Sequence, residues 1–272
     1  MSPEECQISI FLYDIRSTCE SDDVKSDSSY TLFRLLSLGA DLERIRKYMI
    51  REDRLRTAAA ELILRSMILA NKPAKIVRTN PHTHQQTKPF IDSVGLQPQF
   101  NVSHDAEHVA VAVTVPHISV GIDLMKVALP PNRTQHDFFE NMHTVFTSSE
   151  WRYIKGDTTK SLRRFFHLWT AKEAYLKCIG TGLAIDPSEI EILIHDAESD
   201  KPYFEAHVSQ HPIDHFRITI FEDTLPDNVI ALCVSSLRNC DSSWVSLLAA
   251  RDLFPPLKLE DISYNFIHLD SL

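Results

Sequence analysis

Glu173 and Lys177 are the first residues whose types and spacing suggest chemistry. They lie four apart in a run with helical periodicity from about Ser161 to Ile179. On a helical wheel Glu173 falls in the middle of the apolar stripe, with Lys177 one turn further on. The stripe consists of Leu162, Phe166, Trp169 and Leu176. A carboxylate there needs a cation, so we expect an (i, i+4) ion pair with Lys177. The pair could be purely structural, or Glu173 could hold a metal or accept a proton.

A second carboxylate, Asp123, lies in the run Ser119-Val120-Gly121-Ile122-Asp123-Leu124-Met125. Strand alternation places Gly121, Asp123 and Met125 on one face and the intervening aliphatic residues on the other. Gly121 leaves space beside Asp123, which predicts close approach of a ligand. Asp123 and Glu173 together would suit Mg²⁺, which takes few protein carboxylates and completes its shell with water and phosphate. The alternative is that Asp123 is only a charged strand end.

A third candidate is Asn101-Val102-Ser103-His104-Asp105, interpreted as a short strand that runs into a polar turn. Ser103, His104 and the turn amides could all donate hydrogen bonds to phosphate. A turn histidine without a ligand is the alternative.

The elements that must position these residues alternate between helix and strand. We expect a helix from Asp41 to about Ala70, a loop over 79–99, and strands at 100–102, 109–115 and 119–124. A helix around 136–145 and a short one capped by Ser148 or Ser149 should precede the helix from Ser161. Strands at 189–194, 203–208, 216–221 and 229–234 should follow it. This order predicts an α+β fold of two similar halves, residues 1–118 and 119–272.

Composition excludes several classes of protein. The 272 residues carry a formal net charge of −9, which argues against nucleic-acid binding by bulk attraction. Six glycines leave no Gly-rich phosphate loop or Rossmann motif. Five scattered cysteines suggest a reducing compartment, and no run approaches the roughly 20 apolar residues of a membrane helix. With an acidic N-terminus that lacks a secretory layout, we expect a cytoplasmic protein with no membrane association. Two basic runs, 43–56 and 152–164, suit a polyanionic ligand and an acidic protein partner.

Together the three motifs resemble the surfactin-type 4'-phosphopantetheinyl transferases. The order Asn101-Val102-Ser103-His104, Gly121-Ile122-Asp123 and Trp169-Thr170-Ala171-Lys172-Glu173-Ala174-Tyr175-Leu176-Lys177 matches the family's order and spacing. The likeness covers roughly residues 42–194. Residues 146–151 and 121–126 look most like the eukaryotic branch, which includes the enzyme that activates aminoadipate reductase in lysine metabolism.

The resemblance implies a pseudo-two-fold fold with a cleft between its halves, in which the chain moves phosphopantetheine from coenzyme A to a serine of an apo acyl or peptidyl carrier protein. It implies Mg²⁺ held by Asp123 and Glu173, with Glu173 accepting the serine proton and Lys177 at the pyrophosphate. Coenzyme A phosphates would contact Arg44, Arg51, Lys88, Ser103, His104 and Lys177. The basic run 152–164 would face the carrier, and a monomer is expected.

Two departures from the family pattern matter. Many bacterial members carry a second acid at the position of Met125, whose thioether is a poor Mg²⁺ ligand, so two carboxylates and water are expected instead. The usual Gly-Lys-Pro reads Thr87-Lys88-Pro89, which changes the loop shape expected there. Two other functions stay open: a Mg²⁺-dependent phosphohydrolase acting on nucleotides or coenzyme A, and a coenzyme A-binding protein without catalysis.

Overall fold

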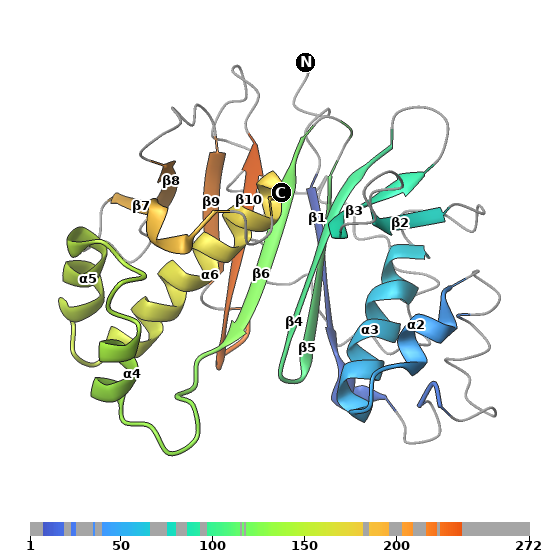
Figure 1. Cartoon of the computed structure of the whole chain (residues 1–272), viewed down its shortest axis with the longest axis horizontal. Helices are drawn as coiled ribbons and strands as arrows, with labels where there is room; N and C mark the ends of the chain where they lie inside the picture. The colour runs from blue at the N-terminus through green and yellow to red at the C-terminus, as the bar shows by residue number, and fades with distance from the viewer. Residues whose placement is uncertain are drawn as a thin grey trace.

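The chain folds into a mixed α/β structure with two larger antiparallel sheets, each with its own helix layer, and a small two-stranded sheet (Figure 1). The computed structural model describes residues 8–18, 23–25, 35, 40–65, 75–79, 86–92, 97–114, 116, 118–181, 185–195, 203–208, 216–221 and 224–235. No helix in these ranges is long and apolar enough to cross a membrane.

The first sheet has the strand order β1-β5-β4. Its strands are β1 (Ile8–Asp14), β4 (Gln99–Asp105) and β5 (His108–Thr114). The hairpin between β4 and β5 pairs Gln99 with Thr114 and Asp105 with His108, so its turn consists of residues 106 and 107 only. Helix α3 (Arg51–Ile63) packs on β5 and buries an apolar core on one face of this sheet. The strand β1 was not predicted from the sequence.

The single helix predicted from Asp41 to about Ala70 is wrong, because residues 47–50 interrupt it. Helix α2 (Leu42–Arg46) ends there, and α3 begins after Ile50, whose backbone is extended. Arg54 stabilises the break by donating hydrogen bonds to the carbonyls of Tyr48 and Met49, at 3.0 and 2.9 Å. These bonds satisfy backbone acceptors that a continuous helix would have paired internally. Residues 66–70 lie outside the described residues.

The loop predicted over 79–99 contains a strand. β2 (Lys75–Thr79) and β3 (Gln86–Asp92) form a two-stranded antiparallel sheet. This correction matters for the site, because Lys88 lies on β3 and Arg78 on β2.

The second sheet has the strand order β6-β10-β9-β8-β7. Its strands are β6 (Val120–Lys126), β7 (Ile190–His195), β8 (Tyr203–Val208), β9 (Phe216–Phe221) and β10 (Asn228–Ser235). The long helix α6 (Ser161–Ile179) has the predicted bounds. It lies across β6 and β10 and ends at Gly180 in the left-handed conformation. All four strands predicted after α6 are confirmed, with bounds shifted by at most one residue.

Two short helices cover one end of α6. They are α4 (Gln135–Asn141) and α5 (Ser148–Lys155), and the short 3₁₀ helices η2 (Ile15–Ser17) and η6 (Pro187–Glu189) complete the described elements. The predicted cap of α5 is wrong by one residue. Thr147 caps it through the amide of Glu150, and the Glu150 side chain accepts from the Thr147 amide in return, which is a capping box.

The two sheets share a third apolar core. Alternation along β6 directs Val120, Ile122 and Leu124 toward Ala110 and Ala112 of β5. The odd-numbered residues lie on the opposite face, as the alternation predicted, and there Gly121 packs against α6. β4 and β6 therefore meet at the centre of the molecule, where Figure 1 shows them side by side.

Candidate active site

Asp123, Ser103 and Lys177 meet where β6, β4 and α6 come together. The Lys177 ammonium donates to Asp123 Oδ1 at 2.6 Å and to Ser103 Oγ at 3.0 Å. Ser103 in turn donates to Asp123 Oδ1 at 2.9 Å and accepts the amide of Leu124 at 3.1 Å. The serine hydroxyl therefore uses its one donor and both acceptor positions, which fixes its orientation.

Lys177 therefore pairs with Asp123, and the predicted ion pair with Glu173 is wrong. The predicted position of Glu173 within a buried stripe is also wrong, because Glu173 and Lys177 are only half-buried. The other sides of α6 are covered by the protein. Lys172 lies on such a side and is the fully buried charged residue of this helix.

Glu173 still interacts electrostatically with this cluster. Burial raises the pKa of Glu173, the negative charge of Asp123 raises it further, and Lys177 opposes the shift. A carboxyl group with a raised pKa beside a second carboxylate is the arrangement expected for a general base or a metal ligand.

The donor atoms fit a magnesium ion. Asp123 is 4% exposed, and its Oδ2 is buried without a hydrogen-bond partner among the described residues. A buried carboxylate oxygen of this kind needs a cation or a donor to offset its desolvation. Hard oxygen donors from two carboxylates suit Mg²⁺. Within the described ranges, no group of three or more His, Cys, Asp or Glu side chains could hold a metal. The protein thus offers two acids, and Met125 supplies no third.

His104 follows Ser103 on β4, so both residues belong to a strand and the predicted polar turn is displaced to residues 106 and 107. Desolvation lowers the pKa of His104, and the positive charges of Arg56 and Lys177 lower it further. The His104 side chain is exposed. Arg56 is itself paired with Asp53, and Lys177 with Asp123.

Arg44 lies in a second cationic group centred on the buried Glu61. Arg44 Nη2 lies 2.6 Å from Glu61 Oε1, Arg65 Nε lies 2.9 Å from Oε2, and Arg78 also pairs with Oε1. Three guanidinium groups share one carboxylate, which leaves an excess of two positive charges. Arg44 Nε is buried without a hydrogen-bond partner among the described residues. This group can attract an anion such as a phosphate. Sequence analysis did not single out Arg78, because it lies at the edge of the stretch interpreted as a loop.

Arg51 and Lys88 lie apart from the Asp123 cluster. Arg51 Nε is 3.9 Å from Asp23 Oδ2, a carboxylate that Arg54 binds more closely, at 2.6 Å. The Lys88 ammonium donates to the carbonyls of Val120 at 2.7 Å and Cys178 at 3.0 Å. Burial lowers the pKa of Lys88. Among the residues predicted for phosphate binding, Ser103 and Lys177 thus contact each other. Arg44, Arg51 and Lys88 bind other partners.

Comparison with known proteins agrees with this geometry. Residues 119–233, which supply Asp123, Glu173 and Lys177, match the model of the 4'-phosphopantetheinyl transferase superfamily. This region is similar to the 4'-phosphopantetheinyl transferase superfamily.

Relatives of this domain carry matching names. The mouse L-aminoadipate-semialdehyde dehydrogenase-phosphopantetheinyl transferase is 30% identical over 166 residues, which cover 58% of this chain and 53% of the relative. A Thraustochytrium phosphopantetheinyl transferase is 34% identical, covering 52% of this chain and 51% of the relative. The Paxillus involutus 4'-phosphopantetheinyl transferase pptA is 29% identical, covering 54% and 61%. The chain spans about half the length of the first relatives it matches. The resemblance predicted from the motifs, including that to the eukaryotic branch, is confirmed.

Gly121 of this matched region has a different role from the one predicted. A methyl group on its Cα would overlap the Ala174 carbonyl and the Cys178 backbone of α6. The missing side chain therefore admits the helix, not a ligand. Because α6 carries Glu173 and Lys177, this close approach sets their distance from Asp123.

Gly121→Ala should lower the free energy of unfolding by about 2 kcal/mol or more, since the helix backbone must move. The measurement is urea unfolding followed by circular dichroism. Gly156→Ala is the matched control, because there the methyl group would meet Arg152 O at 3.0 Å and the movable end of Arg164. Equal, small changes in both variants would contradict this role of Gly121.

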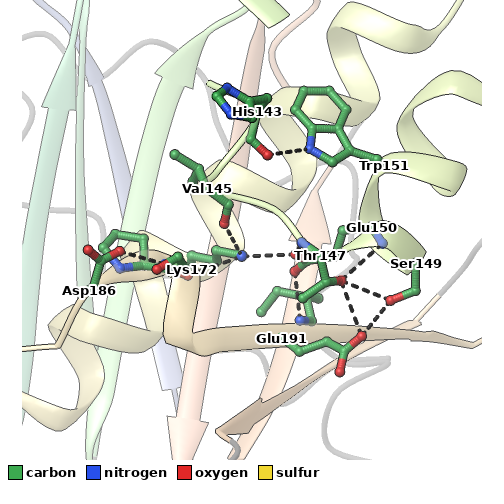
Figure 2. A network of polar contacts seen from close by, with 12 residues as sticks. His143, Val145, Thr147, Ser149, Glu150, Trp151, Lys172, Asp186 and Glu191 are labelled. Atoms are coloured by element: carbon green, nitrogen blue, oxygen red, sulfur yellow. Dashed lines mark hydrogen bonds and ion pairs between the residues drawn. The ribbon is translucent and has the colours of Figure 1, made fainter. Parts of the chain in front are cut away.

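Lys172, the residue before Glu173, forms a buried ion pair that sequence analysis missed (Figure 2). Its ammonium donates to Glu150 Oε2 at 2.9 Å, to Val145 O at 2.8 Å and to Pro187 O at 3.1 Å. Glu150 Oε1 accepts the amide of Ile192 at 2.8 Å. The Glu150 capping box was the available sequence signal. This network joins α6 to α5, η6 and β7, and it fixes the rotation of α6 that presents Glu173.

Proposed function

We propose that the protein transfers the 4'-phosphopantetheine group of coenzyme A to a serine of an apo acyl or peptidyl carrier protein. The observation that carries the proposal is the cluster of Asp123, Ser103 and Lys177 beside Glu173, with a buried Asp123 oxygen that has no hydrogen-bond partner in the part of the chain that the structure describes. This cluster combines two acids for a cation with donors for phosphate. Its acids and lysine lie within the residues that match the superfamily model.

Coenzyme A binding is assigned to both halves of the chain. We propose that residues 1–118 and 119–272 form pseudo-two-fold halves and that coenzyme A lies in a cleft between them. Lys177 and His104 would contact the pyrophosphate, and Ser103 could join them only by releasing its bond to Asp123. Arg44 would contact another phosphate, as the excess positive charge around Glu61 supports. Arg51 and Lys88 stay predicted contacts, although both would have to exchange their present partners for phosphate.

The proposed reaction breaks one P–O bond and forms another. The carrier serine oxygen attacks the phosphorus attached to pantetheine, and adenosine 3',5'-bisphosphate leaves with the bridging oxygen. Glu173 accepts the serine proton, directly or through water, which its raised pKa supports. Lys177 donates hydrogen bonds to the pyrophosphate oxygens as negative charge builds up on the leaving group.

Asp123 and Glu173 would hold Mg²⁺. When bound, the ion supplies charge neutralisation and orientation of the phosphates. Asp123 Oδ1 already accepts from Lys177 and Ser103, so Oδ2 is the oxygen that the structure leaves for the cation.

The carrier is proposed to dock near the basic run 152–164. Arg152, Lys155 and Lys160 are exposed and suit an acidic partner. Arg163 and Arg164 are less suited than expected, because they donate to the carbonyls of Pro226 and Tyr153, at 2.9 and 3.0 Å. A monomeric, cytoplasmic enzyme without nucleic-acid or membrane partners stays a proposal that rests on the sequence.

Intact mass of an apo carrier protein tests the proposal. After incubation with this protein, coenzyme A and Mg²⁺, the carrier should gain one phosphopantetheine group, and EDTA should prevent the gain. Phosphate release from coenzyme A without a carrier would instead indicate the phosphohydrolase. Binding of coenzyme A without modification of several carrier types would indicate a non-catalytic binding protein.

A further inference from the structure

The free edge of β6 is closed by side chains and not by a neighbouring strand. In a strand, each residue directs both its N–H and its C=O to one edge, and the next residue directs both to the other edge. β10 pairs with one edge of β6, and no backbone ladder joins the other edge to β4 among the described residues. That edge is nevertheless buried in the middle of the molecule, so its amides need acceptors.

Three side chains of β4 supply those acceptors at alternate positions. Asn101 Oδ1 accepts the amide of Ile122 at 2.9 Å, and Asp105 Oδ2 accepts the amide of Lys126 at 2.7 Å. Ser103 Oγ accepts the intervening amide of Leu124 at 3.1 Å. Lys88 of β3 completes the edge by donating to the Val120 carbonyl at 2.7 Å. We call Lys88, Asn101, Ser103 and Asp105 the side-chain seam.

The spacing of the seam follows from strand geometry. Residues 101, 103 and 105 lie on one face of β4, and the amides of residues 122, 124 and 126 point to one edge of β6, so both rows repeat every second residue. A shift of either strand by one residue would break all the bonds together. The seam therefore fixes how β4 lies along β6.

We infer that Asn101 and Asp105 are positioning residues, which act through the seam to hold the first sheet and its cations at a fixed place relative to Asp123. Asp123 lies between two amides of the seam, those of Ile122 and Leu124, and its carboxylate bonds to Ser103 of the opposite strand. The seam would thereby keep the proposed phosphate contacts of coenzyme A in the two halves at a fixed spacing, and this part of the inference rests on the proposed function.

Asp105 is the best position for a test. Its bond lies at one end of the seam, it is half-buried, and among the described residues its side chain forms no hydrogen bond or ion pair with a group assigned to metal or phosphate. Asp105→Ala removes the acceptor, whereas Asp105→Asn keeps an acceptor oxygen of the same reach. Glu107→Ala is the matched control, because Glu107 contacts the Lys126 side chain at 3.5 Å and leaves its amide alone.

The first readout is amide hydrogen exchange of the full chain without ligands. Asp105→Ala should speed exchange of the Lys126 amide by about tenfold or more. Asn101→Ala should do the same at Ile122. Asp105→Asn and Glu107→Ala should stay within about twofold of the parent chain at both amides. Unchanged exchange in Asp105→Ala and Asn101→Ala would overturn the seam.

The second readout is carrier modification under varied coenzyme A. The free energy lost with one hydrogen bond to a carboxylate corresponds to roughly a tenfold change in an equilibrium constant. Asp105→Ala should therefore raise KM for coenzyme A about tenfold with a smaller change in kcat, and Asp105→Asn should restore it. Faster exchange with an unchanged KM would overturn the positioning role. A parent chain that modifies no carrier, with exchange as expected, would defeat the proposed function and still support the seam.

Discussion

Replacing Glu173 by glutamine is expected to reduce carrier modification by about 10³-fold while the chain stays folded. Glutamine preserves the shape of the side chain but cannot accept a proton and is a weaker ligand for a hard cation. Intact-mass assays of the carrier over time give the rate. Glu140→Gln on α4, an exposed acid, is the matched control and should retain the parent rate.

The same variant should stabilise the metal-free chain near neutral pH. Because the pKa of Glu173 is raised in the folded state, the folded chain holds this proton to higher pH than the unfolded chain does. Folding stability therefore falls as pH rises from the unfolded pKa of about 4.5 through the folded pKa. Glu173→Gln should raise Tm at pH 7 in EDTA by about 1–3 °C, and the difference should vanish below pH 4.5.

A gain in stability together with a loss of activity would indicate that Glu173 is kept for function at a cost to the fold. Near-normal turnover of Glu173→Gln would remove Glu173 from the catalytic role. A lower Tm at pH 7 in EDTA would show that the carboxylate stabilises the fold and would contradict the assigned charge interactions.

Lys172→Met is the variant expected to lose the most stability, about 3–5 kcal/mol. The variant leaves the Glu150 carboxylate fully buried without its cation, and the two side chains are only 1% and 0% exposed. Burial lowers the pKa of Lys172, and the charge of Glu150 opposes that shift, so the ammonium depends on this partner. Val145 and Pro187 would also lose the donor to their carbonyls.

Urea unfolding at pH 7 measures this loss. Glu150→Gln with Lys172→Met should recover part of it, because no uncompensated charge is then buried. Lys160→Met, at the exposed start of α6, is the matched control and should change the free energy of unfolding by less than about 0.5 kcal/mol. Equal effects in the two lysine variants would contradict the buried pair.

Local pattern predicted much of the fold around the site. The helix from Ser161 to Ile179 and the alternation of β6 follow from residue spacing alone, because a helical or strand period is a property of consecutive residues. The predictions failed where a distant residue replaced a local bond. The turn at 47–50 depends on Arg54, and β3 depends on pairing with β2.

The sequence by itself determined which residues we propose to carry chemistry: Asp123, Glu173 and Lys177, whose order and spacing resemble those of the superfamily. The tertiary structure decided their partners. Lys177 contacts Asp123 and not Glu173, Gly121 admits α6, and Lys88 binds a strand edge. The physical reason is that an ion pair or a hydrogen bond forms with whichever group the packing of β4, β6 and α6 brings within about 3 Å, and spacing along one chain segment cannot specify that meeting.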